Sequence, residues 1–188
     1  MVRYQGRSIY IVVGSGFAYL FLLTDSYSRK IIGYTLEASL AAQGAVKSLT
    51  MAIHQRVSST PGATIHHSDR GSQYCCWEYM KRLEKATIQP SMTESGDPRE
   101  NAIAERVNGI LKSEFLQKQY ETLAALPRLI SIYNVERPHL SLDVLTPSEA
   151  YSQEGPLKRR WKTYPYKSNP PDKVPDSTLT SASLKTTV

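Results

Sequence analysis

Two acids stand out in this chain for their surroundings and their spacing. Asp69 lies in the block His-His-Ser-Asp-Arg-Gly-Ser-Gln-Tyr and Glu105 in the block Asn-Ala-Ile-Ala-Glu-Arg-Val-Asn, with 35 residues between them. Carboxylate oxygens are the ligands that hard divalent cations such as magnesium prefer. Two such cations, roughly 3.5–4 Å apart, can clamp the attacking and leaving oxygens of a phosphodiester. The pair is therefore a candidate for metal-assisted chemistry.

Each acid also has an ordinary interpretation when it is taken singly. Asp69 follows a predicted strand and precedes Gly71, so it could be a plain turn residue. Glu105 could be a solvated residue of a helix. The strand residues beside Asp69, His66 and His67, are better explained by a place in the strand or behind the site than by metal binding. Neither acid is informative without the blocks around it.

A third signal follows at Tyr133-Asn134 and Arg137-Pro138-His139. With the two acid blocks it resembles the catalytic core of retroviral-integrase-like (DDE) transposases of bacterial insertion sequences. The resemblance covers about residues 8–152 and rests on five blocks in the right order. These blocks are residues 16–20, residues 24–33, the Asp69 block, the Glu105 block and residues 133–147.

The resemblance implies an α/β chain with a ribonuclease-H-like fold, acting in DNA transposition or integration by metal-dependent strand cleavage and transfer. In that family an Asp, Asp, Glu triad holds two divalent ions. Asp69 and Glu105 would then be catalytic ligands of Mg²⁺ or Mn²⁺. DNA is the implied partner, a homo-oligomer is compatible with it, and a membrane is not expected. The implied DNA contacts are Lys112, Asn108, Arg106, Arg137 and His139.

One departure from the family pattern changes the functional interpretation. The first triad Asp of the family falls on Arg7 in this chain, although Tyr10 and Ile11 match the pattern. The chain also starts at the core, so the helical DNA-end-binding domain that precedes it in the family is expected to be absent. We therefore expect a truncated or decayed transposase with impaired metal binding, in which Arg7 marks the degenerate position.

Asp25 is the remaining acid near this position in the sequence. A hairpin symmetric about Ser15 would place Arg7 opposite Leu23 and bring Asp25 onto the same sheet face, on a diagonal of roughly 7–8 Å. Asp25 is therefore kept as an alternative metal ligand. The main alternative for the whole chain is a catalytically inactive, nucleic-acid-binding or oligomerising remnant of a transposase. A different ribonuclease-H-like nuclease is disfavoured by the Tyr-Asn and Arg-Pro-His blocks.

The composition of the chain is compatible with each of these hypotheses and does not distinguish among them. The chain has 188 residues, 40% of them hydrophobic, a net charge of +6 and a pI near 9.3. Such a basic balance suits a polyanionic partner. The two cysteines, Cys75 and Cys76, are adjacent on a predicted helix and are unsuited to a disulfide loop or a metal site. They favour a reducing compartment, and with no apparent signal peptide or membrane span we expect a cytoplasmic protein. The resemblance to transposases of bacterial insertion sequences implies that it is bacterial.

Residue patterns predict a mixed five-stranded sheet flanked by helices. The expected strands are residues 8–13, 17–25, 30–37 and 63–67 with a short one at Ile88, and the expected helices are residues 39–55, 72–86, 101–118 and 121–134. Residues 93–99 are expected to form a mobile loop, and Thr146 to Glu149 a capping box. The core is expected to span residues 1–152. Residues 153–188 are expected to form a basic, Pro/Ser/Thr-rich tail that is largely extended or disordered.

Overall fold

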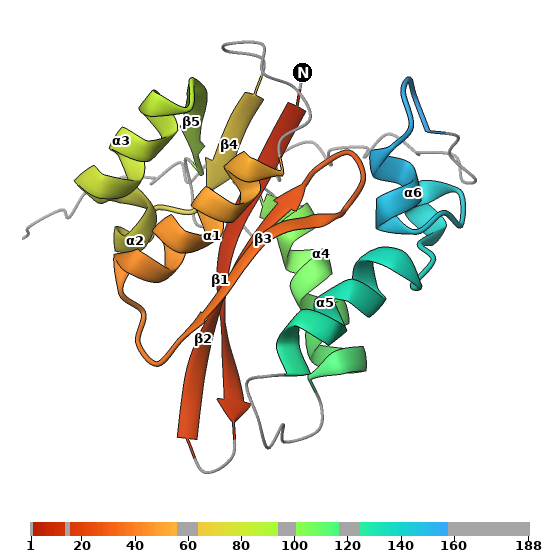
Figure 1. The fold of residues 1–188 in the computed structure, drawn as a ribbon, viewed down its shortest axis with the longest axis horizontal. Helices are drawn as coiled ribbons and strands as arrows, with labels where there is room; N and C mark the ends of the chain where they lie inside the picture. The colour runs from red at the N-terminus through yellow and green to blue at the C-terminus, as the bar shows by residue number, and fades with distance from the viewer. Residues whose placement is uncertain (1, 14–15, 56–63, 94–100, 117–124, 158–188) are drawn as a thin grey trace, which may run out of the picture.

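The computed structural model describes residues 2–13, 16–55, 64–93, 101–116 and 125–157, and its centre is a five-stranded sheet (Figure 1). The strands are β1 (Val2–Val13), β2 (Gly16–Asp25), β3 (Ile31–Glu37), β4 (Thr64–Ser68) and β5 (Ile88–Met92). Their order is β3-β2-β1-β4-β5. The first three strands are antiparallel neighbours, and β4 and β5 run parallel to β1. The predicted mixed sheet is confirmed.

The central strand, β1, is twice as long as its sequence pattern predicts. It begins at Val2, whereas β-branched and aromatic residues become dense only from Ser8 onward. The added stretch includes Gln5, Gly6 and Arg7, which carry little β propensity. It forms a strand because β2 and β4 bind its two edges, and pairing on both sides overrides weak local preference.

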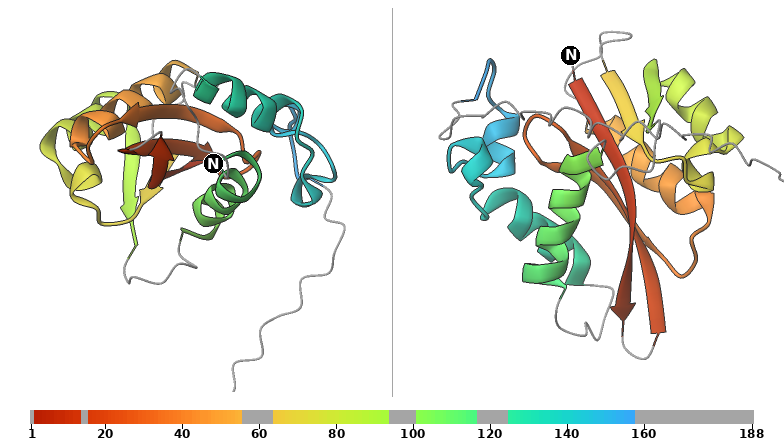
Figure 2. Two further views of the ribbon diagram at one scale, coloured as in Figure 1. Left: turned by 90° about the horizontal axis from the view of Figure 1, so that it is seen from below. Right: turned by 180° about the vertical axis from the view of Figure 1, so that it is seen from behind.

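Helices cover both faces of this sheet (Figure 2). One face packs against α1 (Ala42–His54), α2 (Ser72–Cys75) and α3 (Trp77–Lys85). The other face packs against α4 (Ala102–Ile110), its π-helical continuation η2 (Leu111–Phe115), and α5 (Leu126–Val135). Close approach of α1 to the sheet requires Gly33, because a side chain there would overlap the Ser48 carbonyl.

Two predicted helices have other boundaries in the structure, and the start of a third is confirmed. The helix expected over residues 72–86 is interrupted at Cys76, whose backbone is extended with ψ of 150°. The helix expected over residues 121–134 begins at Leu126, with Pro127 in its first turn, where a missing N–H costs nothing. The capping box at Thr146 is confirmed and starts α6 (Pro147–Tyr151), which follows a short 3₁₀ turn, η4 (Leu140–Leu142).

Two predicted segments cannot be compared with the structure. Most of the expected loop at residues 93–99 and most of the expected tail, from residue 158 on, lie outside the described residues. Within the described part, both cysteines are free, and none of the helices has the length and apolarity needed to cross a membrane.

Candidate functional site

Asp69 comes directly after β4, at the level of the middle of β1. Ser68, the last residue of β4, pairs with Gly6, so the next residues of the two strands, Asp69 and Arg7, are neighbours. The Asp69 Oδ1 atom accepts a hydrogen bond of 3.0 Å from the Gly71 backbone N–H. This is the local turn that the Asp-x-Gly sequence favours. The strand end therefore delivers a half-buried carboxylate to β1.

The first turn of α4 is tied to the same part of β1. The Ala104 backbone N–H donates to Gln5 Oε1 at 2.9 Å, and Asn101 Nδ2 donates to the Gly6 carbonyl at 3.4 Å. The Ala104 bond satisfies one of the amide donors that the beginning of a helix leaves unpaired. Glu105 follows Ala104 directly, so these contacts set its position beside the strand.

Arg7 and Glu105 form an ion pair, with 2.6 Å between Nη1 and Oε1. Their side chains are 30% and 34% exposed, so solvent partly screens the pair. Burial raises the pKa of the neighbouring Tyr74 hydroxyl; Asp69 raises it further and Arg7 lowers it. Both charges are therefore close enough to act on Tyr74. Arg7 therefore lies next to Asp69 in the sheet register and is paired with Glu105, so it adjoins both of the predicted acids.

Asp25 takes no part in this arrangement. The structure pairs Arg7 with Leu22 and not with Leu23, one residue away from the symmetric hairpin that the sequence suggested. Side chains alternate across a strand, so a shift of one residue places Asp25 on the opposite face from Arg7. Asp25 is 3% exposed, and its Oδ2 accepts bonds from the Ser28 backbone N–H at 2.8 Å and hydroxyl at 2.6 Å. These contacts give it a role in holding the turn after β2.

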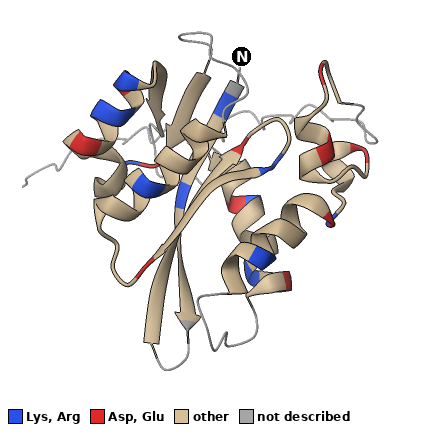
Figure 3. Ribbon diagram, viewed as in Figure 1, with Lys and Arg blue, Asp and Glu red and all other residues tan. Residues whose placement is uncertain are grey.

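The five residues predicted to contact DNA differ in how far their side chains are exposed to solvent. Arg106 on α4 and Lys112 on η2 are exposed, and this helical segment carries both basic and acidic residues (Figure 3). Asn108 and His139 are buried, and each has a side-chain nitrogen without a hydrogen-bond partner in the structure. Arg137 is half-buried. Only the first two of the five present an exposed side chain to an incoming polyanion.

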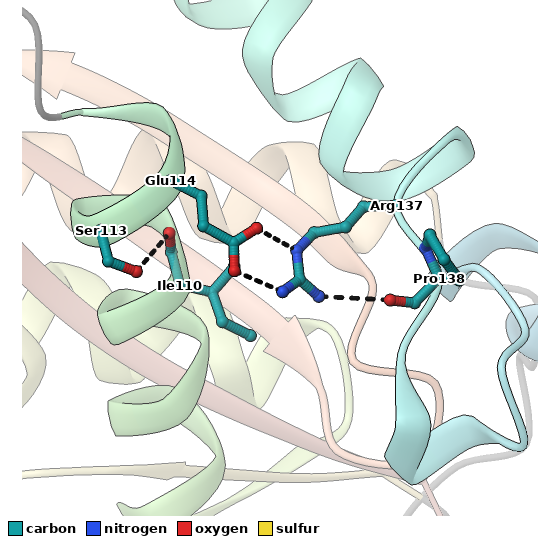
Figure 4. Close-up of polar contacts among 5 residues, drawn as sticks. All are labelled: Ile110, Ser113, Glu114, Arg137 and Pro138. Atoms are coloured by element: carbon teal, nitrogen blue, oxygen red, sulfur yellow. Dashed lines mark hydrogen bonds and ion pairs between the residues drawn. The ribbon is translucent and has the colours of Figure 1, made fainter.

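Arg137 is engaged in a second ion pair on the same helical segment (Figure 4). Its guanidinium binds both carboxylate oxygens of Glu114, through Nε at 2.6 Å and through Nη2, and Nη1 donates to the Pro138 carbonyl at 3.3 Å. The hydrogen bond from Arg137 lowers the pKa of Glu114, and the same bond raises the pKa of Arg137. The pair links η2 to the segment that follows α5.

The Tyr133-Asn134 block supports the core through partners that the sequence did not reveal. Asn134 Oδ1 accepts from the Ile31 backbone N–H, and Asn134 Nδ2 donates to the Ile31 carbonyl, both at 2.9 Å. The Tyr133 hydroxyl donates to the Arg29 carbonyl at 3.1 Å. The amide thus pairs with the edge of β3 as a neighbouring strand would. No local pattern indicates this, because the partners are 103 residues apart.

The two histidines before Asp69 belong to the sheet, as predicted. His66 is 1% exposed, and its Nε2 lies 2.6 Å from the Tyr79 hydroxyl. Burial lowers the pKa of His66 to about 4, so the ring is neutral at pH 7. His67 Nδ1 lies 2.9 Å from the Ser91 hydroxyl of β5. Among the described residues, no group of three or more His, Cys, Asp or Glu side chains is placed to hold a metal ion.

Two family models match this chain, and both describe an integrase core domain. One covers residues 4–98, half of the chain, and the other covers residues 86–147. Together they span β1 to the start of α6 and include both acids of the site. The sequence blocks that suggested the resemblance lie within the same range.

Similar proteins are transposases and an integrase core. A putative transposase for insertion sequence element IS986/IS6110 of Mycobacterium tuberculosis is 36% identical over 57% of this chain and 40% of its own length. Transposase InsF for insertion sequence IS3fB of Escherichia coli is 29% identical over 80% of this chain and 54% of its own. This chain therefore spans only about half of such relatives.

The fold is similar to that of a solved retroviral integrase core. The HTLV-2 integrase catalytic core domain, in a dimeric form in complex with magnesium, has a TM-score of 0.62 and 15% identity, covering 80% of this chain and 95% of that one. At this identity the likeness establishes the fold, which is ribonuclease-H-like.

Proposed function

The chain belongs to the integrase core domain family, and from that membership we propose that it is the core of a DNA transposase whose strand chemistry is impaired. The transposase relatives support the link to DNA transposition. The observation that carries the impairment is the Arg7–Glu105 ion pair. A catalytically inactive, DNA-binding remnant is the second candidate, favoured by the same ion pair.

The residues present do not fit the two-metal site of the family. Such a site needs carboxylate oxygens that are free to bind divalent ions held close together. In this chain Asp69 and Glu105 are the two acids at the site, and the guanidinium of Arg7 already lies on one of them. A guanidinium stays protonated at every relevant pH, so it cannot yield its place by losing a proton.

The positive charge of Arg7 attracts Glu105 and repels a metal ion. Two unit charges about 4 Å apart interact by about 4 kcal/mol at an effective dielectric of about 20. A divalent ion beside Arg7 would meet roughly twice that repulsion, reduced because the side chain is 30% exposed and can turn toward solvent. Arg7 therefore neutralises the charge of Glu105 and competes with any added cation for that carboxylate.

DNA binding depends less on this site than on the basic surface. The net charge is +6, and Arg106 and Lys112 lie exposed on the α4 segment next to the site. Backbone phosphates are bound mainly by such side chains, with release of counterions. We therefore propose weak, sequence-tolerant DNA binding that weakens steeply as salt is added. An affinity that stays constant from low to physiological salt would refute this part of the proposal.

Calorimetric titration with magnesium and manganese tests the role of Arg7. The native chain should bind either ion weakly and should not transfer strands. Arg7→Asp should strengthen binding clearly, because it removes a cation and restores a third acid, and Glu105→Gln should weaken it further. Arg3→Asp is the matched control, since Arg3 lies on the same face of the same strand and undergoes the same change of charge.

Three results would overturn this proposal. Tight metal binding and DNA cleavage by the native chain would show that Arg7 does not obstruct the site. An equal gain from Arg3→Asp and Arg7→Asp would reduce the effect to net charge. No gain at all from Arg7→Asp would show that the position does not contribute a ligand.

A further inference from the structure

Two sulfur atoms from different elements are in contact between α2 and β5. Cys75 is the last residue of α2, Met92 is the last residue of β5, and Cys75 Sγ lies 3.7 Å from Met92 Sδ. Cys75 is exposed and Met92 is half-buried, so solvent reaches the pair. Adjacent cysteines alone indicated no metal site in the sequence, because the second sulfur donor is 17 residues away.

The backbone fixes the position of both residues. Met92 pairs with Ser68, the last residue of β4, in the parallel register of β4 and β5. The Cys75 backbone N–H donates to the Gly71 carbonyl at 3.2 Å, in the turn that follows β4. Both sulfur atoms are therefore carried by elements that are fastened to the same end of β4. Donors on regular elements are held more precisely than donors on loops.

The neighbouring cysteine, Cys76, is engaged elsewhere. Its thiol donates to the Gln73 carbonyl at 3.5 Å, and its side chain packs against the core beneath α1 and α3. The backbone at Cys76 is extended, which separates α2 from α3. The accessible pair is therefore one thiol and one thioether, and Cys76 offers a matched thiol outside it.

The geometry and softness of these donors identify the kind of ion that they suit. Thiolate and thioether sulfurs favour soft ions such as Cu(I), whereas magnesium and manganese prefer oxygen. With metal–sulfur bonds of roughly 2.3 Å, two sulfurs 3.7 Å apart subtend about 107° at one ion, close to the tetrahedral angle. A structural zinc site needs four protein ligands. Among the described residues no group of three or more His, Cys, Asp or Glu side chains supplies them, whereas Cu(I) accepts lower coordination numbers.

The charge balance also favours a monovalent ion at this place. Arg70 lies close by, because its Nε donates at 2.8 Å to the carbonyl of Thr93, the residue after Met92. When Cu(I) replaces the thiol proton of Cys75, one positive charge enters as another leaves with the released proton. The net charge beside Arg70 is then unchanged, whereas a divalent ion would add a charge there.

We propose that Cys75 and Met92 bind one Cu(I) ion between α2 and β5, with the Cys75 thiolate and the Met92 thioether as its protein ligands. The remaining coordination is completed from solvent or by a small exogenous thiol, because Cys75 is exposed. The ion links the end of β5 to α2, next to the turn that carries Asp69. This site is separate from the Arg7–Glu105 pair and does not depend on the proposed DNA transposition.

Anaerobic titration of the full chain with Cu(I), in competition with the chromophoric chelator bicinchoninate, tests the site. The native chain should bind one equivalent of Cu(I), and Cys75→Ser should abolish this binding. Met92→Leu preserves the size of the side chain and should weaken the affinity by about tenfold or more, since losing even an indirect partner of a metal costs that much. Cys76→Ser and Met80→Leu are the controls, because each removes a sulfur outside the pair, and both should bind as the native chain does.

The methionine methyl groups provide an independent readout by NMR, with Ag(I) as an air-stable analogue of Cu(I). The chain has four methionines, so each methyl resonance can be followed separately. One equivalent of Ag(I) should shift the Met92 resonance and leave that of Met80 in place. Cys75→Ser should abolish the shift of Met92. An excess of magnesium should neither shift this resonance nor displace Ag(I).

Three outcomes would overturn the Cu(I) site. Equal losses of affinity in Cys75→Ser and Cys76→Ser would reduce the binding to that of any thiol. Native affinity in Met92→Leu would remove the thioether from the ligand set. Displacement of Cu(I) by an equal concentration of zinc would contradict the selectivity for a soft monovalent ion. None of these results bears on DNA binding or on the magnesium titration of Arg7→Asp, so this proposal and the proposed function can fail separately.

Discussion

Glu105 and Glu114 lie on one continuous helical segment, and each binds an arginine from another element in a different way. Arg7 approaches Glu105 through a single contact at 2.6 Å. Arg137 binds both oxygens of Glu114 in the parallel geometry that suits a guanidinium (Figure 4). Both pairs join two elements, and we expect the pair that binds through two oxygens to stabilise the fold more.

The surroundings of the two pairs reinforce this contrast. Near Glu114, Asn134 makes two buried hydrogen bonds to the edge of β3. Near Glu105, Gln5 makes one bond to the first turn of α4. We therefore expect changes around Glu114 to alter stability, and changes around Glu105 to alter the binding of ions. Three measurements of stability test that distinction.

The largest expected effect is at Asn134. Asn134→Ala should lower the free energy of unfolding by about 2–4 kcal/mol, because it leaves a buried N–H and a buried carbonyl of Ile31 without partners. Gln5→Ala, which removes one bond at the other pair, should cost about 1 kcal/mol. Urea unfolding followed by circular dichroism measures both. Equal losses of stability in Asn134→Ala and Gln5→Ala would contradict the proposed difference between the surroundings of Glu114 and those of Glu105.

Acid should destabilise the protein through two buried histidines. The folded pKa of His139 is about 4, below the ordinary value of 6.5, and that of His66 is also about 4. The unfolded chain therefore binds more protons between these pH values, and stability that is present above about pH 6.5 is lost as the pH falls toward 4. Each group should account for about 2–3 kcal/mol near the acid end of this range.

Substitution of single histidines shows how much each one contributes to the loss of stability in acid. His139→Gln should remove the contribution of His139 to the pH dependence of the free energy of unfolding. The contribution of His66 should remain. Unfolding titrations between pH 7 and 4 give the slope for each variant. A slope that is identical in the native chain and in His139→Gln would contradict the lowered pKa of His139, which comes mainly from burial.

The smallest expected effects concern the two glutamates themselves. Glu114→Gln should destabilise the protein by about 1 kcal/mol, discounted for its 44% exposure, and Glu105→Gln by less than about 0.5 kcal/mol. Both losses should shrink at high salt, which screens exposed charges. Thermal or urea unfolding at two salt concentrations provides the comparison. A larger loss at Glu105 would mean that the Arg7 pair holds the fold, and the contrast would be reversed.

Much of the site was predictable because its signals are local. A strand followed by Asp-x-Gly predicted where Asp69 leaves the sheet, and the apolar stripe of α4 predicted that Glu105 lies off the core face. The capping box at Thr146 depends on residues three apart, so it too was visible in the sequence. Such features follow from periodicity and turn chemistry, which need no knowledge of distant partners.

The sequence by itself determined the family and the mixed sheet. Only the tertiary structure decided the partner of Arg7, the role of Asn134 and the place of Asp25. The contacts of Asn134 join residues 103 apart, and no periodic pattern records such a pairing. The hairpin register was wrong by one residue, and because side chains alternate along a strand, that single step moved Asp25 to the other face of the sheet.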